Sequence, residues 1–207
     1  MTLALALGNL TLCAALFFFE YDSGKSPSLS TWTISKQCQA AAWLLLYFRG
    51  NGLVPDRWPT PSFSSIAAVG FGLSAYGVGV ERGWITRDQA IERTLATLRF
   101  FDGAPQSPTA VGITGYKGFF YHFLDMEHGL RFENIELSTV DTTLLLGGVL
   151  FSQSYFDRAD AREAEIRALA ERIYRRVDWN WAQQARPPKI SMGWIPGKGM
   201  HGNDWEG

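Results

Sequence analysis

The sequence predicts an all-α fold of the α/α toroid type, in which an inner ring of buried helices is surrounded by an outer ring of amphipathic helices. A helix that is apolar on every face is followed by an amphipathic helix, and the same pair recurs later in the chain. An inner helix contacts protein on all sides, whereas an outer helix exposes one face to water. With 207 residues, of which 46% are hydrophobic and 19% charged, the chain can also bury a large core.

The first helix pair is predicted between residues 66 and 101. No charged residue occurs from Trp58 to Val80, and the apolar helix expected at Ile66–Val80 contains four glycines. Such glycines favour close helix packing inside a protein over a membrane span. Thr86–Gln89 then has the capping-box pattern, and it opens an amphipathic helix. The apolar positions of that second helix follow helical spacing at Ile91, Leu95, Leu98 and Phe101.

The second helix pair repeats this plan. Ser138–Asp141 is another capping-box pattern, and it opens an apolar helix through Leu144–Phe151 with Gly147 and Gly148 inside it. Asp160–Glu163 begins a charged helix. The apolar stripe expected on that charged helix is Ile166, Leu169, Ala170, Ile173 and Val177.

Two further segments complete the predicted architecture. Phe119–Asp125 and Leu130–Glu136 are aromatic-rich arms around the short turn Met126–Gly129. They predict a small β-hairpin inserted between the helix pairs, over one end of the rings. Residues Asp178–Gly207 are rich in Trp, Pro and Gly, which predicts an ordered loop because a disordered tail would contain fewer aromatic residues.

The N-terminal segment differs from the rest of the chain. We expect residues 1–50 to form a divergent helical segment and residues 51–207 to form a partial toroid domain. Leu3–Phe19 is almost entirely apolar, but no Lys or Arg precedes it. Two interpretations stay open: a buried first helix, and an export or anchor segment that would place the protein in the periplasm or outside the cell.

Composition excludes several classes of function. The formal net charge is −1, so no basic stripe is available to neutralise the phosphates of a nucleic acid. The chain has three histidines and two cysteines, which makes a His/Cys metal site improbable. It contains no P-loop and no nucleophile elbow. We therefore expect neither a metal nor a cofactor.

Carboxylates and aromatic residues concentrate on and beside the predicted hairpin. Carboxylates beside aromatic rings suit glycoside hydrolysis, in which one acid protonates the leaving oxygen and another activates water. The capping box alone fully explains Asp141, and a solvated turn is the default explanation of Glu127 and Glu133. Asp125 and Glu136 each end an apolar arm, where a charge needs a partner or a polar cavity. The full cluster is Asp125, Glu127, Glu133, Glu136 and Asp141, among Tyr116, Tyr121, His122 and Arg131.

Other candidate residues have two interpretations each. Lys117 either contacts a ligand hydroxyl or ends a loop. His122 is either a satisfied strand histidine or a functional one. Several tryptophans are either sugar platforms or core residues. These are Trp58, Trp84, Trp179, Trp181, Trp194 and Trp205.

Six runs of residues, in order, resemble the bacterial glucoamylase-like family, which includes endo-β-1,2-glucanases and a domain of cyclic β-1,2-glucan synthases. The resemblance extends from about Gly52 to the end of the chain. The runs are Gly52–Trp58, Ser65–Phe71, Val80–Ile85, Thr94–Phe101, Gly115–Asp125 and Glu136–Thr142.

The resemblance implies a six-fold α/α toroid with a carbohydrate cleft, and inverting, metal-independent hydrolysis of a β-glucan, foremost β-1,2-glucan. It implies that Asp125, Glu136 and Asp141 are cleft acids, without showing which of them is the general acid. The substrate-binding or supporting residues expected from it are Lys117, His122, Arg57, Glu81 and Tyr116. The expected partner is an oligo- or polysaccharide.

The chain departs from the family in two respects. Residues before about Gly50 do not follow the family's usual opening helix. The second departure is the number of helices. The chain provides about half of the helices that a six-fold ring requires, and a half-ring exposes the flanks of its inner helices. The sequence is therefore interpreted as a fragment that can self-associate through these flanks. The alternative to a hydrolase is a truncated, non-catalytic fragment that binds carbohydrate or completes a ring.

Overall fold

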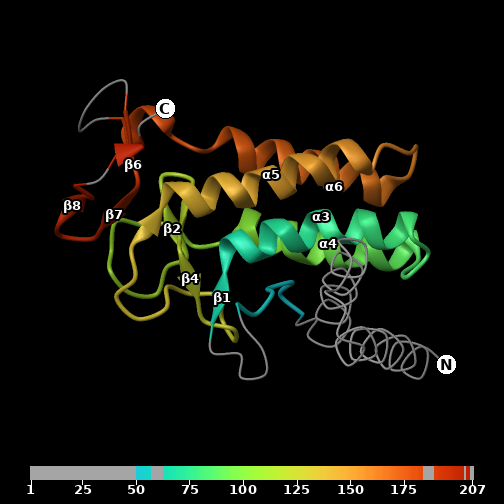
Figure 1. Cartoon of the computed structure of the whole chain (residues 1–207), viewed down its shortest axis with the longest axis horizontal. Coiled ribbons are helices and arrows are strands. Elements are labelled where there is room, and N and C mark those ends of the chain that lie inside the picture. The colour runs from blue at the N-terminus through green and yellow to red at the C-terminus, as the bar shows by residue number, and fades with distance from the viewer. Residues whose placement is uncertain (1–49, 57–62, 184–188, 203, 206–207) are drawn as a thin grey trace, which may run out of the picture. The chain divides into compact units, whose positions relative to one another are not determined.

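Four long helices lie in two layers and connect to small β-sheets at one end of the described part of the chain (Figure 1). The computed structural model describes residues 50–56, 63–183, 189–202 and 204–205. The predicted segment 1–50 and the interpretations of Leu3–Phe19 thus lie almost wholly outside the described residues. The four helices are α3 (Ile66–Glu81), α4 (Arg87–Gly103), α5 (Thr139–Tyr155) and α6 (Ala161–Arg175).

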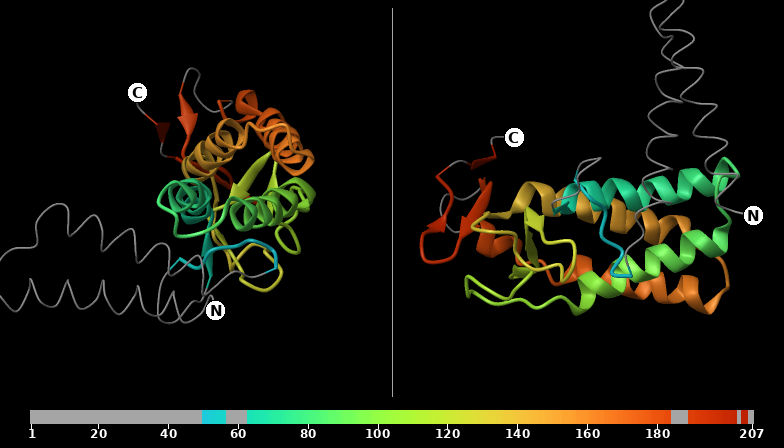
Figure 2. Two further views of the ribbon diagram at one scale, coloured as in Figure 1. Left: turned by 90° about the vertical axis from the view of Figure 1, so that its right-hand side faces the viewer. Right: turned by 90° about the horizontal axis from the view of Figure 1, so that it is seen from below.

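Helices α3 and α5 each begin directly at a two-residue strand. The strand β1 (Ser64–Ser65) precedes α3, and β5 (Leu137–Ser138) precedes α5. The last residue of each strand is the N-cap: Ser65 Oγ accepts from the Ala68 N–H, and Ser138 Oγ from the Asp141 N–H. Both helices therefore start at the sheet end and run side by side, while α4 and α6 return beside each other (Figure 2).

Glycines set the distance between α3 and α5. A Cβ atom on Gly148 would lie far inside van der Waals contact with the carbonyl oxygen of Gly70, and one on Gly70 would do so with the carbonyl oxygen of Leu144. The two backbones are thus in direct contact where the helices cross. This confirms the close helix packing predicted from the embedded glycines.

The amphipathic helices begin where the capping residues predict. Thr86 and Gln89 form the reciprocal capping box at the start of α4. Asp160 caps α6, because its Oδ1 accepts from the N–H groups of Arg162 and Glu163. The predicted apolar positions of both helices are buried, among them Leu98 of α4 and Ile166 of α6.

Helices α3 and α5 are not buried on every face, contrary to the prediction from their apolar sequences. The side chains of Phe71 on α3 and Leu144 on α5 are 65% and 42% exposed. Exposed apolar side chains on the inner helices agree with the expectation for a partial ring. Self-association through these side chains stays a prediction. Among the described helices, none has the length and hydropathy needed to cross a membrane.

A five-stranded antiparallel sheet lies at the end of the helices where α3 and α5 begin. Its strand order is β2-β3-β5-β7-β8. Two smaller sheets pair β1 with β4 and β6 with β9. A short helix, α7 (Trp179–Ala182), follows α6. The remaining strands are β2 (Gly115–Tyr116), β3 (Phe119–Tyr121), β4 (Phe123–Leu124), β6 (Ile190–Ser191), β7 (Gly193–Ile195), β8 (Gly199–Met200) and β9 (Asp204–Trp205).

The predicted β-hairpin around Met126–Gly129 is only partly correct. The turn forms, but the second arm contributes one isolated bridge, between Leu124 and Arg131, instead of a strand. A tighter hairpin joins β2 to β3 through Lys117 and Gly118, which have φ angles of 57° and 85°. Two successive residues with positive φ are typical of the two-residue turns that match strand twist.

The predicted loop at Asp178–Gly207 was also wrong in part, because this segment contains α7 and strands β6 to β9. Its strand β7 pairs with β5, with Trp194 opposite Leu137 and Gly193 opposite Ser138. The C-terminal part of the chain therefore lies directly beside the segment that leads into α5.

Candidate functional site

One histidine side chain contacts two of the predicted cleft acids. His122 Nδ1 lies 2.9 Å from Glu136 Oε1, and His122 Nε2 lies 3.4 Å from Asp141 Oδ1. The imidazole ring therefore stands between the two carboxylates. We refer to His122, Glu136 and Asp141 as the His–carboxylate cluster.

Strand register brings His122 and Glu136 together. Tyr121 of β3 is opposite Leu137 of β5, so the residues directly after and before them are also opposite. The His122 N–H donates to the Glu136 carbonyl oxygen over 3.0 Å. Residues opposite each other across an antiparallel pair share a face of the sheet, which places both side chains on one face.

Asp141 reaches the cluster from the first turn of α5. Its N–H donates to Ser138 Oγ over 3.1 Å, so Ser138 is the N-cap as predicted. Its carboxylate, however, accepts from the Ser138 hydroxyl at Oδ2 (2.5 Å) and contacts His122 at Oδ1. A capping-box side chain would instead accept the N-cap backbone N–H. Capping therefore explains the position of Asp141 but not the orientation of its carboxylate.

The cluster is partly open to solvent. The side chains of His122, Glu136 and Asp141 are 28%, 31% and 15% exposed. The ring of Phe123 lies 3.9 Å from the ring of His122, and Phe63 lies 4.3 Å from Phe123. The site thus combines two partly accessible carboxylates with an aromatic flank. In the described ranges, no group of three or more His, Cys, Asp or Glu residues has an arrangement that could hold a metal ion.

The third predicted cleft acid, Asp125, caps its own turn. Its carboxylate accepts backbone N–H groups from Glu127 (3.0 Å), His128 (2.6 Å) and Leu130 (2.7 Å). Burial raises the pKa of Asp125, but the three N–H donors outweigh it and lower that pKa below its ordinary value. These contacts are those of a turn-stabilising carboxylate.

Lys117 and Tyr116 lie away from the cluster. Lys117 Nζ donates to Asp178 Oδ2 over 3.2 Å from the β2–β3 turn, which is at the opposite end of β3 from His122. The ring of Tyr116 packs against Trp181 and Trp194 at 5.5 and 5.3 Å. The structure therefore does not bring these two residues to the carboxylates.

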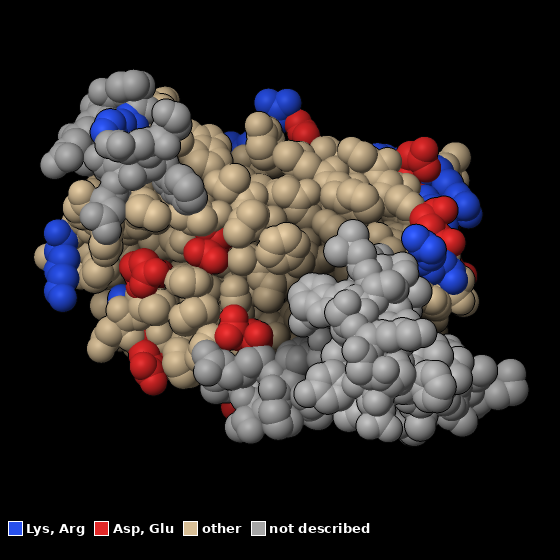
Figure 3. Space-filling view, in the orientation of Figure 1, with Lys and Arg blue, Asp and Glu red and all other residues tan. Residues whose placement is uncertain are grey.

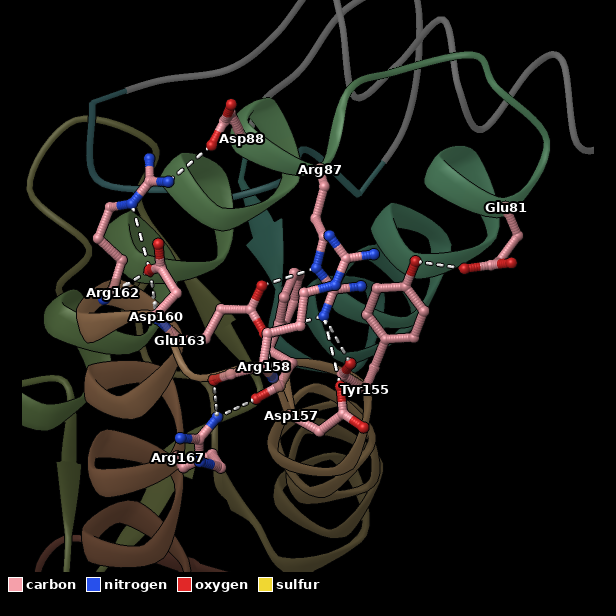
Figure 4. Close-up of polar contacts among 11 residues, drawn as sticks. Glu81, Arg87, Asp88, Tyr155, Asp157, Arg158, Asp160, Arg162, Glu163 and Arg167 are labelled. Atoms are coloured by element: carbon pink, nitrogen blue, oxygen red, sulfur yellow. Dashed lines mark hydrogen bonds and ion pairs between the residues drawn. The ribbon is translucent and has the colours of Figure 1, made fainter.

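Glu81, another residue implied by the resemblance, is also not found in the cluster. Glu81 is the last residue of α3 and accepts from the Tyr155 hydroxyl over 2.7 Å (Figure 4). Ile66, the first residue of α3, lies beside His122, since its N–H donates to the His122 carbonyl oxygen. The full length of α3, about 1.5 Å per residue, thus separates Glu81 from the cluster. Arg57 lies outside the described residues.

Three of the candidate tryptophans cover the opposite face of the sheet. Trp194 is opposite Leu137, one position along β5 from Glu136, and successive side chains of a strand point to opposite faces. Trp181 packs against Trp194, and Trp179 against Phe119, with ring centroids 5.8 and 5.1 Å apart. These contacts favour the core interpretation. Trp84 is 36% exposed, Trp58 lies outside the described residues and the Trp205 side chain is not described.

Gly193 is a residue of the site that the sequence did not indicate. A Cβ atom on Gly193 would lie 2.6 Å from the Leu137 carbonyl oxygen and 3.3 Å from Glu136 Cγ. A side chain at this position would push against the Glu136 side chain. Because the pairing of β5 with β7 joins distant segments, no local pattern could have predicted it.

Charge on the molecular surface is consistent with an uncharged ligand. Over the sheet end of the face in Figure 3, acidic side chains and fewer basic ones stand apart from one another on mostly uncharged surface. At the helix-turn end of the same face, acidic and basic side chains alternate. Among the described residues visible on this face, basic side chains do not gather in the way that binds phosphate backbones.

No protein-family model matches the chain. A curated relative is the exo β-1,2-glucooligosaccharide sophorohydrolase (non-reducing end) of Parabacteroides distasonis. The two are 30% identical over 153 residues, which is 70% of this chain and 20% of the relative. The chain thus spans about a fifth of the length of that relative.

Solved structures share the fold. A provisionally named glucoamylase of Bacteroides uniformis aligns with 25% identity and a TM-score of 0.68, over 79% of this chain and 39% of the other. The β-1,2-glucanase of P. distasonis aligns with 25% identity and a TM-score of 0.66, over 79% and 24%. An endo-β-1,2-glucanase of Chitinophaga pinensis, complexed with sophorotriose and glucose, aligns with 21% identity and a TM-score of 0.65, over 78% and 39%.

These comparisons confirm the predicted resemblance. The chain is similar in sequence and fold to bacterial glucoamylase-type proteins and to β-1,2-glucan hydrolases. It is mostly helical with small sheets, as the matched part of those structures requires, and it covers less than half of each of them. The closed six-fold ring stays a prediction.

Proposed function

We propose that the described domain carries part of the catalytic cleft of a β-glucan hydrolase, and that β-1,2-glucan is its substrate. The observation that carries the proposal is the placement of Glu136 and Asp141 on either side of His122, in a partly exposed site. Similarity to β-1,2-glucan hydrolases supports the choice of substrate.

The spacing of the two carboxylates supports an inverting reaction. Each contacts a different nitrogen of one imidazole ring, so the width of the ring and two contacts of 2.9 and 3.4 Å separate the two oxygens. Inverting glycosidases hold their two carboxyl groups about 6.5 to 9.5 Å apart to leave room for water, while retaining enzymes hold them about 5 to 5.5 Å apart.

The contacts of the two acids favour different roles. Both oxygens of Asp141 are occupied, one by the Ser138 hydroxyl and one by His122. Glu136 contacts His122 through Oε1, and within the described residues no hydrogen bond is found to its Oε2. We assign Glu136 as the general acid, because among the described residues only its Oε1 has a partner and Oε2 can turn toward the leaving oxygen, and Asp141 as the base that orients water.

The proposal is tested by measuring new reducing ends. Purified chain of confirmed foldedness is incubated with linear β-1,2-glucan, and with starch and a β-1,3-glucan as alternative substrates. We expect turnover of the first substrate alone, with the α-anomer as the initial product detected by NMR, because inversion at a β-linkage produces it.

Two variants and a matched control complete the experiment. Glu136→Gln and Asp141→Asn should each abolish turnover while leaving the circular dichroism spectrum unchanged. Glu127→Gln makes the same chemical change as the first variant at an exposed turn position, and it should keep full activity. Retained turnover in both site variants would rule out this catalytic pair. Saturable glucan binding without turnover in the unmodified chain would instead support the non-catalytic alternative.

A further inference from the structure

We infer that His122 is a positioning residue that sets the separation of Glu136 and Asp141, and that it does not bind substrate as the resemblance implies. The inference rests on the proposed function, because it assigns a role within the same cluster. It is carried by the use of both ring nitrogens, by the anchoring of the His122 backbone and by the independent origin of the two carboxylates.

Both ring nitrogens of His122 face a carboxylate. Nδ1 forms a hydrogen bond of 2.9 Å with Glu136 Oε1, and Nε2 lies 3.4 Å from Asp141 Oδ1, within ion-pair distance. An imidazole has only these two polar atoms, so a sugar hydroxyl would have to compete with a carboxylate at either nitrogen.

The backbone of His122 is held by hydrogen bonds on both sides. The His122 N–H donates to the Glu136 carbonyl oxygen over 3.0 Å, and its carbonyl oxygen accepts from the Ile66 N–H over 3.2 Å. The ring also lies 3.9 Å from the ring of Phe123. The backbone of His122 is thus held between Glu136 and the start of α3, and its ring is placed by the contacts with Phe123 and the two carboxylates.

The two carboxylates come from different elements and have no described contact with each other. Glu136 precedes β5, whereas Asp141 lies in the first turn of α5. The described contact that the two carboxylates share is the His122 ring, which therefore couples their positions.

Steady-state kinetics separate the two roles of His122. A positioning role predicts that His122→Ala lowers kcat about 100-fold, the loss that a misplacement of about 1 Å can cause, with KM unchanged. Added imidazole should restore part of the rate. The kcat of His122→Asn, which keeps one polar contact, should lie between that of the unmodified chain and that of His122→Ala. His128→Ala makes the matched change at an exposed turn position and should behave like the unmodified chain. A raised KM with unchanged kcat would show substrate binding and overturn the inference.

A second measurement does not depend on turnover. The ¹⁵N chemical shifts of the His122 ring are recorded by NMR in the unmodified chain and in Glu136→Gln and Asp141→Asn. We expect each variant to shift chiefly the nitrogen that faces the changed residue. If the unmodified chain hydrolyses no glucan but the shifts respond, the proposed function fails while the positioning contact stands. If the ¹⁵N shifts of the ring are the same in both variants as in the unmodified chain, the inference is overturned, whether or not the chain is active.

Discussion

Arg87, the first residue of α4, forms a two-bonded ion pair with Glu163 in the first turn of α6. The guanidinium donates from Nε to Oε1 over 2.6 Å and from Nη2 to Oε2 over 2.9 Å (Figure 4). The side chains are only 15% and 2% exposed, and the guanidinium also lies over the rings of Tyr155 and Phe156. This pair joins the two helix hairpins at the end opposite the His–carboxylate cluster.

We expect Arg87→Met to lower the free energy of unfolding by about 3 to 5 kcal/mol, because it leaves the buried Glu163 carboxylate without a cationic partner, with the Arg158 N–H still donating to it. The double variant Arg87→Met/Glu163→Leu should lose less than the single variant, since it removes the orphaned charge. Denaturant unfolding measures both. Arg99→Met breaks a pair whose side chains are 57% and 40% exposed, so it should cost only about 0 to 1 kcal/mol. Equal losses at the two pairs would contradict the role of burial.

The same pair predicts a pH dependence of stability. The hydrogen bonds from Arg87 lower the pKa of Glu163 below its ordinary value of 4.5. A carboxylate with a lowered pKa in the folded state stabilises the protein above its unfolded pKa, and this stabilisation is lost as the pH falls through the folded pKa. The stability difference between the unmodified chain and Glu163→Gln should thus be constant near neutral pH and shrink below about pH 4.5. A difference that grows on acidification would have the wrong sign.

The crossing of α3 and α5 predicts opposite effects at two adjacent glycines. Gly148→Ala would place its Cβ against the Gly70 carbonyl oxygen, and such overpacking costs about 1 to 3 kcal/mol. A Cβ on Gly147 would meet nothing within 4 Å, so Gly147→Ala should raise helix stability by about 0.5 to 1 kcal/mol. Thermal unfolding monitored by circular dichroism compares the two. Similar melting temperatures for both variants would show that the helices can separate without loss.

The helices could be predicted because their signals are local. Apolar periodicity and capping residues located α3, α4, α5 and α6, and the embedded glycines indicated the close contact at Gly70 and Gly148. Strand pairing was predicted poorly, because β5 pairs with segments on both sides of it in the chain. The hairpin prediction followed aromatic content and overlooked the positive-φ turn at Lys117 and Gly118.

The site was predictable in composition but not in arrangement. The sequence indicated His122, Glu136 and Asp141, and the structure brings these three together. Sequence spacing cannot distinguish them from Asp125 or Lys117, because which residues meet depends on strand register and on the face of the sheet. Glu81 shows the same limit, since it matches the family motif but lies at the far end of α3.

Asp125 distinguishes a structural carboxylate from a cleft acid. Asp125→Asn should lower stability by about 1 kcal/mol, because the amide group cannot accept at both former oxygen positions and at least one exposed or partly buried N–H of the turn loses its partner. Turnover per folded molecule should be unchanged. Chemical denaturation and initial rates on β-1,2-glucan measure the two effects, with Glu127→Gln in the same turn as the control. Lost turnover in a folded Asp125→Asn variant would support the cleft role that the resemblance implies.

The assignment of acid and base can be tested with a substrate that needs no acid. An aryl β-sophoroside with a nitrophenolate leaving group departs without protonation, so loss of the general acid matters little for it. Glu136→Gln should therefore regain most of its activity on this substrate while staying inactive on β-1,2-glucan, and Asp141→Asn should be inactive on both because water activation is still required. Rates of nitrophenolate release measure this directly. The reverse pattern, with Asp141→Asn active on the aryl substrate, would exchange the two roles without removing either residue from the cluster.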